Sequence, residues 1–100
     1  MEFLMKYNIT NEEISKIEEA NSENTLKNIK MNLENVNAII DYLINLGITT
    51  ETLKDLFVYQ IGMFFKTKPE IEQVFDEYEI DSIVKSLNYD VNTLDLIEFN

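Results

Sequence analysis

Apolar side chains recur along this chain at intervals of three and four residues, which is the period of an amphipathic helix. The clearest stripe falls between residues 33 and 44, and no segment alternates at period two for long enough to predict a strand. The pattern therefore predicts an all-α fold. The stripes expected to be buried are Ile14 and Ile17; Leu33, Val36, Ile39, Ile40, Leu43 and Ile44; Leu53, Leu56 and Phe57; Ile71, Val74, Phe75 and Tyr78; Ile83, Val84 and Leu87; and Val91, Leu94, Ile97 and Phe99.

Helix-start and helix-stop residues stand between these stripes. Thr10 and Glu13 fit a capping box, in which each side chain bonds to the backbone N–H of the other residue. Gly47 follows an apolar stripe and predicts a left-handed C-terminal cap. The polar segment 21–30 predicts either a loop or an irregular short helix. The other expected starts are Asn32, Thr49 or Thr50, the triplet Thr67-Lys68-Pro69, Asp81 and Asp90.

A short phrase occurs three times in the chain. In each copy an apolar helix ends at a small or amide residue, one apolar residue follows, and a new helix begins. Such self-similarity is typical of stacked helical repeats. We therefore expect one domain, residues 1–100, with about three stacked helical-hairpin repeats that form a short right-angled or superhelical bundle. The copies are Phe3–Ile17, Tyr42–Leu56 and Ile83–Ile97, with breaks at Asn8, Gly47 and Asn88.

One stretch of this pattern carries a family resemblance. Residues 33–56, LENVNAIIDYLINLGITTETLKDL, resemble the helix, Leu-Gly-apolar, capped-helix phrase of the mitochondrial transcription termination factor family. The resemblance implies a superhelical stack of short helical repeats. It also implies a nucleic-acid-binding function, which is the function of that family.

The net charge of −11 favours a different partner. Nucleic-acid binders normally present a basic field that displaces counterions from phosphates, and this chain has the opposite field. It also has no arginine, the side chain that best matches phosphates and guanine edges. We therefore expect nucleic acid and anionic membranes to be repelled, so that the charge serves either a protein partner with a basic surface or solubility alone.

The composition argues against catalysis and metal binding. The chain contains no histidine and no cysteine, the commonest general base and the usual soft metal ligands. Adjacent carboxylates such as Asp76 and Glu77 diverge around a helix and do not face one reacting atom. No Asp-rich loop has the central glycine of a calcium-binding hand. We expect no enzyme activity, no cofactor and no metal.

Two groups of residues are candidates for partner binding. The run 56–65 is apolar on more than one face, so it predicts either a central helix or a groove or dimer seam on one side. The acidic group predicts a contact for a basic partner, a mimic of nucleic-acid phosphates, or merely a solvated face. The leading hypothesis is a non-enzymatic protein-interaction module with an acidic rim, and a homodimer is an alternative. The candidates are Phe57, Tyr59, Phe64 and Phe65 for the groove, and Glu70, Glu72, Asp76, Glu77, Glu79 and Asp81 for the rim.

The sequence also predicts where the protein acts. Its first residues, MEFLMKYN, are too acidic and too short for a signal peptide, and no stretch has the roughly 20 apolar residues of a membrane span. We expect a cytoplasmic protein. Richness in Asn, Ile and Lys without Arg is typical of AT-rich coding sequence, and so we expect a small bacterial or phage protein.

Overall fold

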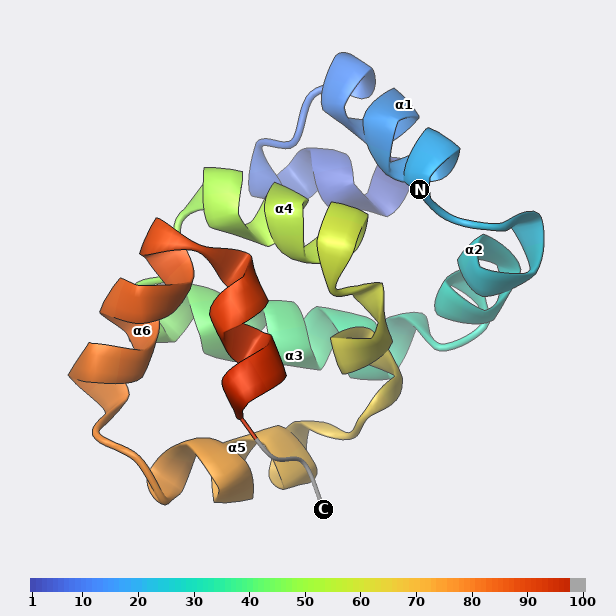
Figure 1. The fold of residues 1–100 in the computed structure, drawn as a ribbon. Helices are drawn as coiled ribbons and strands as arrows, with labels where there is room; N and C mark the ends of the chain where they lie inside the picture. The colour runs from blue at the N-terminus through green and yellow to red at the C-terminus, as the bar shows by residue number, and fades with distance from the viewer. Residues whose placement is uncertain (98–100) are drawn as a thin grey trace.

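Helices joined by short turns form the part of the chain that the computed structural model describes, residues 1–97 (Figure 1). No strand occurs in this part, so the predicted all-α class is confirmed for it. The α-helices are α1 (Asn11–Ala20), α2 (Glu23–Lys30), α3 (Leu33–Leu46), α4 (Thr50–Tyr59), α5 (Lys68–Asp76) and α6 (Ile80–Tyr89), and the 3-10 helices are η1 (Glu2–Tyr7), η2 (Ile61–Phe65) and η3 (Val91–Leu96).

Helix α3 crosses the middle of the fold, with α1 and α4 on one side of it and α5 on the other (Figure 1). It contacts α2, η2, α5 and α6. Four side chains of its predicted stripe are completely buried, whereas Leu33 is half-buried and Ile44 is 41% exposed. The predicted stripe is therefore confirmed at its centre and is too wide at its ends. The four buried residues are Val36, Ile39, Ile40 and Leu43.

The apolar run 56–65 is not one helix. Gln60 leaves the helical conformation, with φ −134° and ψ 37°, and divides the run into α4 and η2. This break turns two aromatic rings toward each other: Phe57 and Phe64 stack with centroids 4.0 Å apart and planes 6° from parallel. Both are fully buried, so the run contributes an aromatic centre to the core.

The first two predicted breaks are left-handed turns and the third is not. Asn8 has φ 68° and Gly47 has φ 109°. Asn88, in contrast, lies inside α6, so the expected break there is wrong. The chain turns two residues later because Asp90 is extended and caps η3, with its carboxylate accepting from the N–H of Asn92 at 2.9 Å.

Helix caps follow the sequence closely, with a difference at α6. The capping box of Thr10 and Glu13 is present, and Thr49 rather than Thr50 caps α4. Asp81 does not cap α6; the N-cap position is Glu79, and Asp81 lies in the first turn. Within the polar segment 21–30, residues 23–30 form a regular helix, α2, which Ser22 caps: its hydroxyl accepts from the N–H of Thr25 at 3.1 Å.

Three other expected positions are Asn32, Tyr78 and Phe99. Asn32 occupies the N-cap position of α3 but makes no side-chain cap bond. Tyr78, expected on the buried side, is 42% exposed because α5 ends at Asp76 and the chain leaves its helical face. Phe99, expected to face inward, lies outside the described residues.

Two asparagine side chains join turns that are far apart in the sequence. The Asn21 amide donates to the carbonyl oxygens of Ile17 at 2.8 Å and Phe57 at 2.9 Å, and so it satisfies the C-terminal ends of α1 and α4 together. The Asn88 amide donates to the Gly47 carbonyl at 3.0 Å and accepts from the Thr49 N–H at 3.1 Å. These bonds hold α1 against α4, and α6 against the start of α4.

Gly47 provides the first testable prediction. Gly47→Ala should cost about 1–2 kcal/mol of unfolding free energy, because a residue with a Cβ is strained in the left-handed region. Space is not the cause: the added Cβ would lie at an ordinary 3.5 Å from Val84 Cγ1. Gly47→Asn should cost less than half as much, since asparagine tolerates this conformation and Asn8 adopts it in the first copy. Urea unfolding of both variants measures the two costs, and equal costs would contradict this interpretation.

No helix in residues 1–97 is long and apolar enough to cross a membrane.

Candidate functional site

The predicted aromatic groove is divided between the core and the surface. Phe57 and Phe64 are fully buried, and Phe3 packs edge-on against Phe57 with centroids 6.5 Å apart. Tyr59 and Phe65 are 66% and 43% exposed. The structure therefore brings Phe57 and Phe64 together as core residues and leaves Tyr59 and Phe65 as the surface members of the predicted set.

The predicted acidic group extends along α5 and into α6, and its two members in the first half of α5 have local structural roles. Glu70 closes a capping box with Thr67, whose N–H donates to the Glu70 carboxylate at 3.1 Å. This bond, followed by the bond from the Thr67 hydroxyl, lowers the pKa of Glu70. Glu72 pairs with Lys68 at 3.3 Å. Both carboxylates are therefore already engaged within their own helix.

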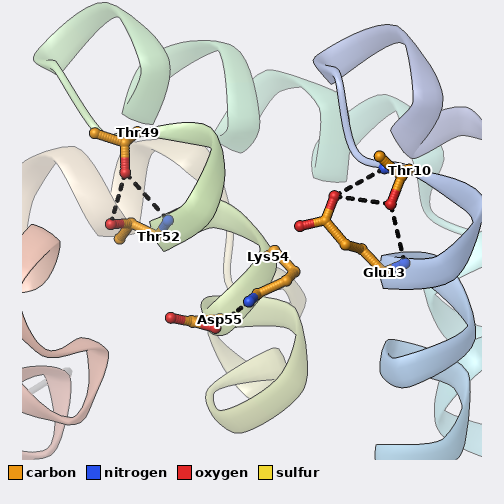
Figure 2. Close-up of polar contacts among 6 residues, drawn as sticks. All are labelled: Thr10, Glu13, Thr49, Thr52, Lys54 and Asp55. Atoms are coloured by element: carbon orange, nitrogen blue, oxygen red, sulfur yellow. Dashed lines mark hydrogen bonds and ion pairs between the residues drawn. The ribbon is translucent and has the colours of Figure 1, made fainter.

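The same physics governs the capping box at the start of α1. Figure 2 shows Glu13 reaching back to the N–H and hydroxyl of Thr10, each at 3.0 Å. These bonds lower the pKa of the Glu13 carboxyl, the backbone bond most. A carboxyl whose pKa is lowered by folding stabilises the fold above its ordinary pKa and loses this contribution as the pH falls through the folded value.

The other four acidic residues lie at the end of α5 and around the α5–α6 turn. Asp76 is the last residue of α5, and Glu77, Glu79 and Asp81 follow at the turn and in the first turn of α6. All four are exposed. The Glu79 carboxylate accepts from the Ser82 hydroxyl at 3.2 Å. Glu77, Glu79 and Asp81 thus follow one another around the α5–α6 turn, which we call the acidic corner, and about 9 Å of helix separates Glu70 from Asp76 at the end of α5.

An apolar groove begins at this acidic corner. It has a volume of about 240 Å³ and lies between α6 and η3. Ile83 and Ile97 are 7% and 8% exposed, whereas Leu96 is 80% exposed and Tyr78 is 42% exposed. We call it the α6–η3 groove; its lining residues are Tyr78, Glu79, Ser82, Ile83, Ser86, Thr93, Leu96 and Ile97.

Sequence reasoning missed this groove, although one signal was present. Leu94 and Ile97 were expected inside, and both are buried. Leu96 lies outside that stripe, at a position where a large apolar side chain has no predicted neighbour. A leucine outside the buried stripe was therefore the signal in the sequence that could have indicated a surface contact.

A second hollow, the α4–α6 cleft, has about 230 Å³ and lies where the end of α6 meets α4. It contains the exposed Tyr59, and several of its polar groups are already bonded within the fold. Asn88 bonds to the turn before α4, and Asp90 caps η3. Lys54 pairs with Asp55 at 3.0 Å, as Figure 2 shows, and this hydrogen bond raises the pKa of the lysine. The cleft is thus a polar joint between helices.

A third hollow, of about 620 Å³, lies beside α1 and η1. Its lining mixes both charges, with Glu2, Glu18 and Lys30, and apolar side chains such as Phe3 and Leu33. This mixture has no chemical pattern that selects one class of ligand.

The described residues contain no group of three or more acidic, histidine or cysteine side chains placed to hold a metal ion. Among them, every buried side-chain nitrogen and oxygen has a hydrogen-bond partner. The α6–η3 groove, with its acidic corner, is therefore the feature of this surface that best fits a binding role.

Comparison with known proteins assigns no function. No protein-family model matches the chain, and neither the curated proteins nor the solved structures contain a significant match. The resemblance to the mitochondrial transcription termination factor family stays a prediction.

Proposed function

We propose that this chain is a non-enzymatic protein-interaction module that acts inside the cell and binds a partner with a basic surface. The observation that carries the proposal is the α6–η3 groove, an apolar surface that begins at exposed carboxylates. Glu79 of the acidic corner lines this groove, with the exposed Glu77 and Asp81 close to it in the chain, and Leu96 is 80% exposed at the groove's edge.

Two physical terms favour such a partner. Covering an exposed leucine contributes about 1.5–3 kcal/mol, which gives binding energy independent of charge. A net charge of −11 steers a basic partner toward the surface and repels acidic ones. The volume of about 240 Å³ is also below the range of about 300–1,000 Å³ that is typical of cofactor and small-molecule pockets.

We also propose that the module is built from three stacked helix–turn–helix units. The second helices of the three copies, α1, α4 and η3, contact one another in chain order, and α3 contacts α6. The first two turns have nearly the same cap conformation: Thr10 has φ −77° and ψ 162°, and Thr49 has φ −78° and ψ 161°. These similarities support the repeat. The third copy differs most from the other two, because its second helix, η3, is a 3-10 helix and not an α-helix.

Charge reversal at the acidic corner tests the proposed function. In affinity capture from cells that express the protein, Glu77→Lys combined with Glu79→Lys should reduce recovery of the partner by about tenfold or more. The matched control is Glu18→Lys with Glu19→Lys, which changes net charge equally on the exposed end of α1. Quantitative mass spectrometry measures recovery. An unchanged set of captured proteins with the corner variant would reject the proposal.

The alternatives give different results with the same protein. A nucleic-acid binder of the transcription termination factor type would shift DNA or RNA in a gel and weaken steeply as salt rises. A nucleic-acid mimic would bind neither, but would displace DNA or RNA from a basic protein. A homodimer would sediment faster at higher protein concentration.

A further inference from the structure

We propose that the α6–η3 groove binds a short amphipathic helix of the partner, anchored by one or two apolar side chains and with Lys or Arg toward the acidic corner. This inference rests on the proposed function and adds the chemical form of the bound segment. It follows from the dimensions, polarity and charge of the groove.

The size of the groove sets the size of the anchor. About 240 Å³ between α6 and η3 accommodates side chains but not a folded surface. Ile83 and Ile97 are almost fully buried, and Leu96 and Tyr78 extend into solvent. An apolar side chain inserted there would therefore be surrounded by four large side chains.

The polarity of the groove favours an apolar anchor. Two of its hydroxyl groups are already engaged: Ser82 donates to Glu79 at 3.2 Å and Thr93 donates to the Ser86 carbonyl at 3.4 Å. The inserted side chain therefore does not need to supply an acceptor to these hydroxyls, and an apolar group enters without leaving them unpaired.

The backbone around the groove favours a helix over an extended peptide. Its walls are two helices, and no strand edge exists in residues 1–97 to pair with an added strand. The main chain of a bound peptide therefore has no strand to pair with at the groove. We expect the contacts to be made by side chains of the peptide, spaced as on one face of a helix.

Charge decides between a basic partner and a second copy of this chain. The lining contains Glu79 and no lysine, and Glu77 and Asp81 are exposed carboxylates two residues before and after Glu79 in the chain. Two copies packed through this face would bring their acidic corners together, on chains of net charge −11 each. A lysine or arginine on the bound helix, beside the apolar anchor, is complementary to this corner.

A synthetic peptide tests the inference directly. The probe is a helical peptide of leucine and lysine only, with leucines at i, i+3, i+4 and i+7, and its binding is measured by calorimetry. Leu96→Ala should weaken its binding by about tenfold. Met31→Ala should not, although Met31 is also 75% exposed, because it lies at the distant α2–α3 turn. Circular dichroism checks that both variants stay folded.

The charge variants separate the two proposals. If Glu77→Lys with Glu79→Lys weakens binding and Leu96→Ala does not, the basic partner stands and the apolar anchor is overturned. If neither variant differs from its matched control, both proposals fail.

A chain ending at Ile97 should bind the probe as tightly as the full chain. Binding tightened about tenfold by this truncation would identify residues 98–100 as the occupant, and concentration-dependent sedimentation abolished by Leu96→Ala would identify a second copy; either result overturns the inference.

Discussion

Phe64→Ala should reduce the free energy of unfolding by about 3–5 kcal/mol, which is a large part of the 5–15 kcal/mol typical of such domains. Phe64 is fully buried and stacks on Phe57 with centroids 4.0 Å apart. Truncation removes this contact and leaves a cavity in the part of the core where α4 meets η2. The neighbouring rings cannot fill the space without leaving their own rotamers.

The adjacent Phe65 provides the matched control. It is 43% exposed, so Phe65→Ala should cost less than about 1 kcal/mol. Urea unfolding followed by circular dichroism gives both values. Equal losses for the two variants would contradict the placement of Phe64 in the core, and would restore the predicted groove at residues 57–65.

Asn21→Asp should produce the second large effect, a loss of about 2–4 kcal/mol. The Asn21 amide donates to two carbonyl oxygens, those of Ile17 and Phe57. The carboxylate of aspartate has the same shape but no donor, so both carbonyls lose their partner. It also places a negative charge beside the C-terminal ends of α1 and α4, where the helix dipole is negative.

Asn28→Asp separates the charge from the lost bonds. Asn28 is exposed in the last turns of α2, so this variant adds the same charge near a helix C-terminus without removing a bond that joins two helices. Its cost should stay below about 1 kcal/mol in the same urea titration. If both variants cost the same, the amide bonds of Asn21 do not hold α1 and α4 together.

Local sequence signals predicted most of the helices because their causes are local. The capping box of Thr10 and Glu13 and the left-handed Gly47 each depend on residues within one turn. The stripe of α3 depends only on helical period. The error at Asp81 has the same local origin, since Glu79 and Asp81 are both acidic residues near the start of α6, and only the backbone conformation selects between them.

The candidate site was less predictable because it depends on contacts between distant segments. Gly62 in the run 56–65 indicates a helix end nearby, but nothing in the sequence indicates that the break falls at Gln60 or that Phe64 then stacks on Phe57. The same holds for Asn88, whose bonds to Gly47 and Thr49 cross from the third copy to the second. The acidic residues around the α5–α6 turn were identified from sequence, but the groove beside them exists only because η3 packs against α6.

Chemical-shift mapping of the bound leucine–lysine peptide on the isotope-labelled protein tests most directly where this molecule binds. The amides that shift most should be those of the α6–η3 groove, with Ser82, Ser86, Thr93 and Leu96 among them. The strongest shifts at Tyr59 and Tyr89 in the α4–α6 cleft, or equal shifts beside every exposed carboxylate, would contradict the account.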